Sequence, residues 1–293
     1  MSCLMNVARS IFCAVALAGP MISASPGVAA EPDYATHLQA LQKTVPKGFT
    51  ITLQKPFVVI GDEIPSLVRQ RSTNTVKWAV EMLKKDYFSR APDEIIDVWL
   101  FQNKASYEKY TKSLFDDKPD TPFGYYSPTH HALIMNISTG GGTLVHEIVH
   151  PFMRANFPQC PAWFNEGMGS LYEQAGEENG HIHGYPNWRL PALQKAIQRG
   201  DVPPFETMMR TSDSQFYGRT SIGTQYSHHY AQARYLCYYL QQNGLLTTFY
   251  REFTANVKSD PSGVETLKSV LKATDLKTFQ KEWESFVLKL KLD

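Results

Sequence analysis

The chain has 293 residues, of which 43% are hydrophobic and 19% charged, a composition typical of a globular protein with a sizeable core. Its 29 basic and 28 acidic side chains nearly balance. Electrostatics therefore gives no reason to expect nucleic acid or an anionic membrane surface as a partner.

The first thirty residues differ from the rest of the chain. Arg9 is their only charged side chain, and the apolar run over 11–19 is too short to span a bilayer. Val28 and Ala30 fit the small positions that precede a signal-peptidase cut. We expect residues 1–30 to be a secretory signal peptide that is cleaved after Ala30. The mature protein is then secreted or periplasmic, without a membrane anchor. An uncleaved anchor or a disordered tail is the alternative.

Two cysteines, Cys160 and Cys237, remain after such a cleavage. In an oxidising compartment they can form a disulfide, but they can equally be two small buried hydrophobic residues. The sequence does not decide between these alternatives.

Helix and strand patterns alternate in residues 31–140, which we take as a mixed α/β lobe with a small sheet. The predicted elements are a helix over 34–45, two strands within 49–62, a helix over about 64–88, a strand over 94–101, a helix over 104–115, a loop over 116–131 and a strand over 131–138. We expect the last strand, with the segment ALIMN, to form the edge of the sheet.

Residues 141–293 show almost only helical patterns and are predicted to form a helical lobe. The predicted helices cover 143–157, 162–174, 189–199, 224–242, 245–255, 263–272 and 275–290. This order of elements favours an α+β fold with a cleft between the two lobes.

The segment HEIVH contains two histidines, His146 and His150, with Glu147 between them. Thr143 can cap a helix that begins at Leu144. Residues four apart project from one face of a helix, so both imidazoles can bind one zinc ion. Glu147 can then act as the general base for an attacking water.

A zinc ion needs a third protein ligand, and Glu166 is the candidate. It lies sixteen residues after His150, inside a predicted helix, close to the aromatic residues Trp163 and Phe164. A carboxylate in such surroundings is costly unless it is paired or binds a cation. The alternative is a carboxylate that interacts with the helix dipole.

HEIVH followed by WFNEG and Glu173 resembles the gluzincin metallopeptidases, which include the thermolysin and aminopeptidase N groups and the peptidase-MA-like proteins. The resemblance implies a thermolysin-like zincin fold with one zinc ion per chain, bound by His146, His150 and Glu166. It also implies that Glu147 is the general base. Glu173 can hydrogen-bond a ligand histidine or a substrate amine, or lie in solvent.

The segment YAQARYLCYYLQQNG is similar to a later helix of the aminopeptidase branch and places Tyr230 at the position of an oxyanion-stabilising tyrosine. Tyr226 and His229 are alternative donors, and Tyr230 can also be a core aromatic. The chain lacks the Gly-x-Met-Glu-Asn segment of that branch, which puts cleavage from the amino terminus in doubt.

The sequence thus predicts a zinc metallopeptidase with a peptide or protein substrate. The alternatives are a catalytically inactive zinc-containing protein that binds peptide or cell-wall material, and a hydrolase of other amides or esters. Oligomeric state and side-chain preference are not predicted.

Overall fold

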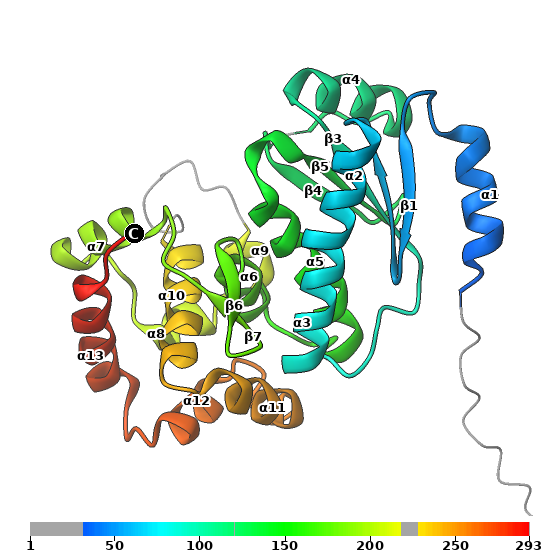
Figure 1. Cartoon of the computed structure of the whole chain (residues 1–293). Coiled ribbons are helices and arrows are strands. Elements are labelled where there is room, and N and C mark those ends of the chain that lie inside the picture. Colours follow the sequence, from blue (N-terminus) through cyan, green and yellow to red (C-terminus); the bar gives the residue numbers. More distant parts are fainter. Residues whose placement is uncertain (1–31, 120, 218–227, 293) are drawn as a thin grey trace, which may run out of the picture. The chain divides into compact units, whose positions relative to one another are not determined.

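A five-stranded sheet with helices on both faces forms the first half of the described structure (Figure 1). The structure is a computed structural model that describes residues 32–119, 121–217 and 228–292. The predicted signal peptide lies outside these residues. The strands of the sheet are β1 (Thr50–Gln54), β2 (Phe57–Gly61), β3 (Ile96–Phe101), β4 (Gly124–Ser127) and β5 (Ala132–Asn136).

The helices of the first half agree with the predicted ranges. They are α1 (Tyr34–Thr44), α2 (Pro65–Arg71), the π-helix η1 (Ser72–Lys77), α3 (Trp78–Asp86), α4 (Lys104–Phe115) and the 3₁₀ turn η2 (Ile137–Thr139). The single helix predicted over about 64–88 is thus a helical run of three consecutive segments, with a π-helix in the middle.

The strand order of the sheet is β1-β2-β3-β5-β4. Strands β2, β3 and β5 are parallel, whereas β1 pairs with β2 and β4 pairs with β5 in antiparallel orientation. The expectation that ALIMN forms the edge is wrong, because this segment is β5 and has a partner on each side. The edge strand next to β5 is β4, which includes Tyr125 and Tyr126. Prolines at 119, 122 and 128 made this short strand look like a loop.

Alternate residues of the buried strands face opposite sides of the sheet. Val58, Ile60 and Trp99 pack in one cluster with residues of α1 and α4. Val59 and Val98 belong to a second cluster, which continues through the helices of the second half. Both faces are therefore covered, and Pro32–Asp293 form one compact unit.

The second half contains helices, as predicted, but also a small hairpin. Its helices are α5 (Gly141–Asn156), α6 (Ala162–Leu171), α7 (Leu190–Arg199), α8 (Phe205–Met209), α9 (Asp213–Phe216), α10 (His229–Gln242), α11 (Leu246–Asn256), α12 (Val264–Leu271) and α13 (Leu276–Lys289). Strands β6 (Ala175–Glu178) and β7 (His181–Gly184) pair in antiparallel orientation. This hairpin contradicts the expectation of an almost strand-free second half. The two strands were missed because both are polar and only four residues long.

Two local expectations about the second half have definite outcomes. Helix α5 begins at Gly141 after Gly140, whose φ of 113° few other residues adopt, so Thr143 is not its cap. The helix continues through Pro151 to Asn156. Cys160 and Cys237 are both free thiols, so they form no disulfide. Cys237 is buried and Cys160 is half-buried.

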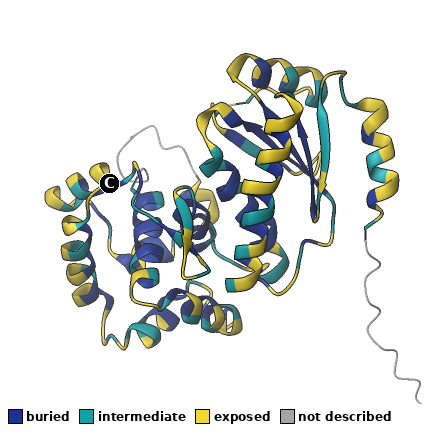
Figure 2. Cartoon of the chain, viewed as in Figure 1, coloured by how far each residue is buried: buried dark blue, intermediate teal, exposed yellow. Residues whose placement is uncertain are grey.

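Burial differs strongly between the helices. Figure 2 shows α10 buried along most of its length, whereas α1 and α4 turn exposed faces outward. None of the helices within the described ranges combines the length and the apolar character that a membrane crossing requires.

One polar contact connects α1 to the buried sheet. His37 Nε2 lies 2.7 Å from Oδ1 of Asp97, a buried residue of β3. Burial raises the pKa of Asp97 above its ordinary value, although the hydrogen bond to His37 acts in the opposite direction. The carboxyl therefore depends on His37 for a partner.

We predict that His37→Ala lowers the free energy of unfolding by about 1–3 kcal/mol, because it leaves a buried polar group without this partner. Urea denaturation measures the change. Gln42→Ala, at an exposed position of the same helix, should stay within about 0.5 kcal/mol of the wild type. Equal stability of all three proteins would contradict the prediction.

Candidate metal centre

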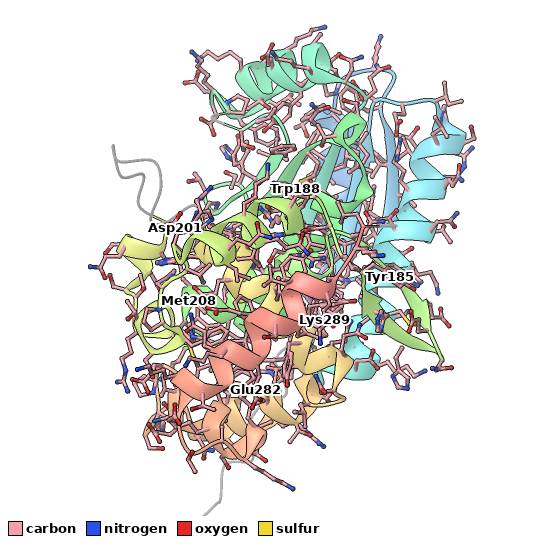
Figure 3. All side chains as sticks on the ribbon, turned by 90° about the vertical axis from the view of Figure 1, so that its left-hand side faces the viewer. Tyr185, Trp188, Asp201, Met208, Glu282 and Lys289 are labelled. Carbon is pink, nitrogen blue, oxygen red and sulfur yellow. The ribbon has the colours of Figure 1, made fainter. Side chains whose placement is uncertain are left out.

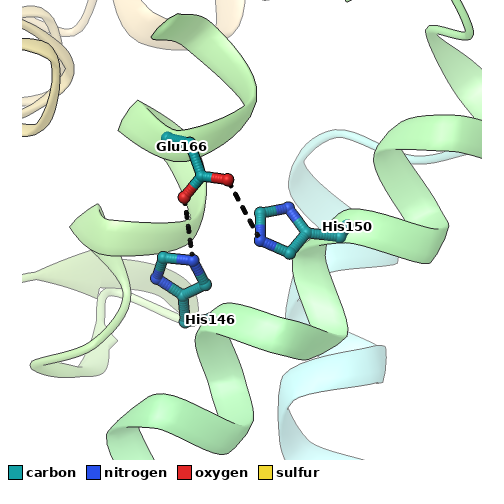
Figure 4. Close-up of side chains that lie close together, drawn as sticks. All are labelled: His146, His150 and Glu166. Atoms are coloured by element: carbon teal, nitrogen blue, oxygen red, sulfur yellow. Dashed lines mark hydrogen bonds and ion pairs between the residues drawn. The ribbon is translucent and has the colours of Figure 1, made fainter. Parts of the chain in front are cut away.

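Helix α5 carries the two histidines of the motif on one face. His146 is buried and His150 is half-buried, and their ring centroids are 4.8 Å apart. Leu144, Ile148 and Val149, which point to other sides of the helix, are fully buried or nearly so in the core. The core thus holds α5 while both imidazoles point toward α6 (Figure 4).

Helix α6 brings Glu166 to these histidines. Its carboxylate Oε2 lies 3.2 Å from Nε2 of His146, and Oε1 lies 3.8 Å from Nε2 of His150 (Figure 4). Only the segment over 157–161 separates α5 from α6. The chain therefore reverses direction within a few residues and places the carboxylate opposite the motif.

The donor set fits a zinc ion. One ligand atom from each of His146, His150 and Glu166 lies within 4.8 Å of the others. Donors at 2.0–2.1 Å from a tetrahedral zinc are about 3.3 Å apart, so small side-chain shifts suffice. Two imidazoles and a carboxylate also form a ligand set that zinc uses in catalytic sites.

The second ring nitrogen of each histidine has its own partner. His146 Nδ1 lies 3.1 Å from Glu173 Oε1, and His150 Nδ1 lies 3.0 Å from Asn165 Oδ1. An Nδ1–H that donates to these oxygens leaves each Nε2 facing Glu166, where a metal ion can take the place of a proton. Such outer contacts orient ligand histidines in metal sites.

Glu173 is itself held by two further residues. Arg189 forms an ion pair with its carboxylate, with Nη2 2.5 Å from Oε1, and Asn187 Nδ2 donates to Oε2 at 3.0 Å. The guanidinium carbon of Arg189 also lies 4.1 Å from the ring centroid of Trp188. Trp188 is 67% exposed and is labelled in Figure 3.

His146 and Glu166 stabilise each other's charge. Burial lowers the pKa of His146, but its hydrogen bonds to Glu166 and Glu173 outweigh this effect and raise the pKa to about 10. Burial raises the pKa of Glu166, but the histidines outweigh it and lower the pKa to about 2. A metal ion at Nε2 would take the place of the proton, so its binding would release a proton.

Glu147 lies beside the triad on α5. Its side chain is half-buried, and burial raises its pKa above the ordinary value, against the opposite effect of His150 and His146. A raised pKa suits a carboxylate that accepts and returns a proton near neutral pH.

The oxyanion role of Tyr230 stays a prediction. Tyr230 packs at 5.0 Å between ring centroids against Phe216, and no hydrogen bond from it to Glu166 is observed among the described residues. Burial and the charge of Glu166 raise the pKa of Tyr230. His229 is buried at the start of α10, with its ring 5.8 Å from that of Phe216. Tyr226, the other alternative donor, lies outside the described residues.

Tyr217, at the end of α9, contacts the triad directly. Its hydroxyl donates to Glu166 Oε1 at 2.9 Å. Burial and the Glu166 carboxylate raise the pKa of this phenol, which keeps its proton available for donation. Sequence reasoning missed Tyr217, Asn187 and Arg189 because no motif connects them to HEIVH. Asn165 could have been found as the residue beside Glu166.

Gly169 allows α6 to approach α5 closely. A β-carbon at this position would lie 3.0 Å from Nε2 and Cδ2 of His146, closer than nearly all real contacts. Because Gly169 has no side chain, the imidazole ring of His146 can lie directly against the backbone of α6.

The sequence matches no known family and no curated protein, so the function has to be inferred from the site itself.

We predict that Gly169→Ala lowers the free energy of unfolding by about 1–3 kcal/mol through overpacking against His146. Gly141→Ala is the matched control, since its β-carbon would meet Thr75 at an ordinary 3.7 Å. The control should be as stable as the wild type or up to about 1 kcal/mol more stable, because alanine favours helix. Thermal or urea unfolding measures both, and a Gly169→Ala protein as stable as the control would contradict the prediction.

Proposed function

We propose that the protein is a secreted or periplasmic zinc metallopeptidase of the gluzincin type. The observation that carries the proposal is the convergence of His146, His150 and Glu166, with Glu147 beside them. The partners of both Nδ1 atoms support it, because a pair of solvated surface histidines would not need them.

The fold supports the finer proposal of a thermolysin-like zincin arrangement. The sheet has three parallel strands and an antiparallel strand at each edge, and the edge strand β4 packs against the motif helix α5. The Arg154 guanidinium of α5 lies 4.8 Å from the ring centroid of Tyr126 in β4. We propose that an extended peptide substrate pairs with this edge by main-chain hydrogen bonds.

The proposed chemistry divides between the ion and the side chains. A zinc ion held by His146, His150 and Glu166 would supply Lewis-acid chemistry, which polarises a carbonyl and makes water more acidic. Glu147 accepts the proton of the attacking water and delivers it to the leaving amine. Tyr230 donates a hydrogen bond to the developing oxyanion.

We expect about one zinc ion per chain in the purified mature protein and at least tenfold weaker binding in Glu166→Ala, which removes a ligand. Elemental analysis and competition with a chelator measure this. Glu177→Ala removes an exposed carboxylate of β6 instead and should bind zinc like the wild type. A wild-type protein without zinc affinity would refute the proposed function.

Glu147→Gln should retain zinc but lower the rate of peptide cleavage about 10²- to 10⁴-fold, because the proton acceptor is lost. A panel of quenched fluorescent peptides gives the rates, with Glu177→Gln as the control. Unchanged cleavage by Glu147→Gln would contradict the proposed mechanism. A zinc-loaded wild type that binds peptides and cleaves none would favour the zinc-containing binding protein.

A further inference from the structure

The two oxygens of the Glu166 carboxylate have different surroundings. Oε2 faces His146 Nε2 at 3.2 Å. Oε1 lies farther from its histidine, 3.8 Å from His150 Nε2, and accepts the Tyr217 hydroxyl at 2.9 Å. Oε1 therefore accepts from a neutral donor and lies beyond hydrogen-bond distance of its histidine, while Oε2 lies at hydrogen-bond distance from a candidate ligand nitrogen.

Tyr217 is held in this position by α9, although its own side chain is 49% exposed. The backbone N–H of Ala162, at the start of α6, donates to Oδ1 of Asp213, at the start of α9, at 3.2 Å. Phe216 is buried and packs against Tyr230. These contacts connect α9 to both α6 and α10. The two helices together therefore fix the position of the Tyr217 hydroxyl relative to Glu166.

A capping box strengthens the start of this short helix. The Ser212 side chain accepts the backbone N–H of Gln215, and the Gln215 side chain accepts the backbone N–H of Ser212. The segment over 212–217 thus has its own local hydrogen bonds in addition to its contacts with α6 and α10. It forms an ordered support beside Glu166.

A carboxylate can bind zinc through one oxygen or through both. A hydrogen bond to one oxygen favours binding through the other and prevents rotation of the carboxylate. One-oxygen binding by the third ligand leaves room for water or substrate at the metal, which a catalytic site requires. The Tyr217 hydroxyl can have this effect because it contacts Oε1 alone.

We propose that Tyr217 is a positioning residue for the third metal ligand: it holds Glu166 by Oε1 and presents Oε2 to the metal. This inference rests on the proposed function, since it assumes that Glu166 is a ligand. It gives Tyr217 a task separate from that of Tyr230, which the proposed mechanism places at the substrate.

Metal affinity tests the inference without any catalytic turnover. Tyr217→Phe removes only the hydroxyl, and Tyr230→Phe is the matched control on α10. Zn²⁺ and Co²⁺ are titrated against a chromophoric chelator in the full mature protein. We expect Tyr217→Phe to bind both metals about 10- to 100-fold more weakly than the wild type, the usual effect of losing an outer partner of a ligand. Tyr230→Phe should stay within about threefold.

Cobalt also provides a spectroscopic signature. The visible absorption of the Co²⁺ protein reports ligand geometry, so it should change in Tyr217→Phe and remain as in the wild type in Tyr230→Phe. Circular dichroism and urea unfolding verify that both variants fold.

Each outcome separates the inference from the function on which it rests. Wild-type affinity and spectrum in Tyr217→Phe would overturn the positioning role and leave the metallopeptidase proposal standing. A wild-type protein that binds neither metal would overturn both.

Discussion

The burial of Glu166 opposite two histidines is the constraint on which the centre depends. A buried carboxylate such as that of Glu166 loses its hydration, at a cost of several kcal/mol, unless positive charge or donors replace the water. His146, His150 and Tyr217 are the groups that the fold supplies for this purpose. Without a metal, a proton on His146 compensates the charge. The proposed zinc ion would compensate it more completely, since the donors already surround a common point.

The rest of the fold keeps α5 and α6 at the distance that this pair requires. The sheet and the hydrophobic core hold α5, and α10 supports α6 from the other side. Gly167 faces α10 so closely that a β-carbon would lie 2.9 Å from Cys237 Sγ. The fully buried Arg234 of α10 donates to the carbonyls of Ser170 and Leu171, at the end of α6. The helix that presents Glu166 is therefore fixed at its carboxyl end by a cation, which also suits the helix dipole.

The sequence predicted those parts of the structure that have local signals. The spacing of His146 and His150 is a property of one helix, and a carboxylate among aromatics identified Glu166. The mixed α+β fold and most helix ranges follow from periodicity in the same way. Tyr217 and Arg189 reach the site through tertiary packing, which no short motif encodes. Strand β4 was missed because its pairing with β5, rather than its own composition, makes it a strand.

The ion pair between Glu173 and Arg189 has a consequence for the net charge of the centre. Because Arg189 neutralises Glu173, the partner of His146 adds no charge of its own. A divalent cation together with the carboxylates of Glu166 and Glu147 then sums to zero. If Glu147 takes up a proton in the proposed reaction, this sum would become positive by one unit, at the stage when negative charge would develop on the substrate carbonyl. The centre would thus attract negative charge more strongly at the step in which the oxyanion forms, without movement of any helix.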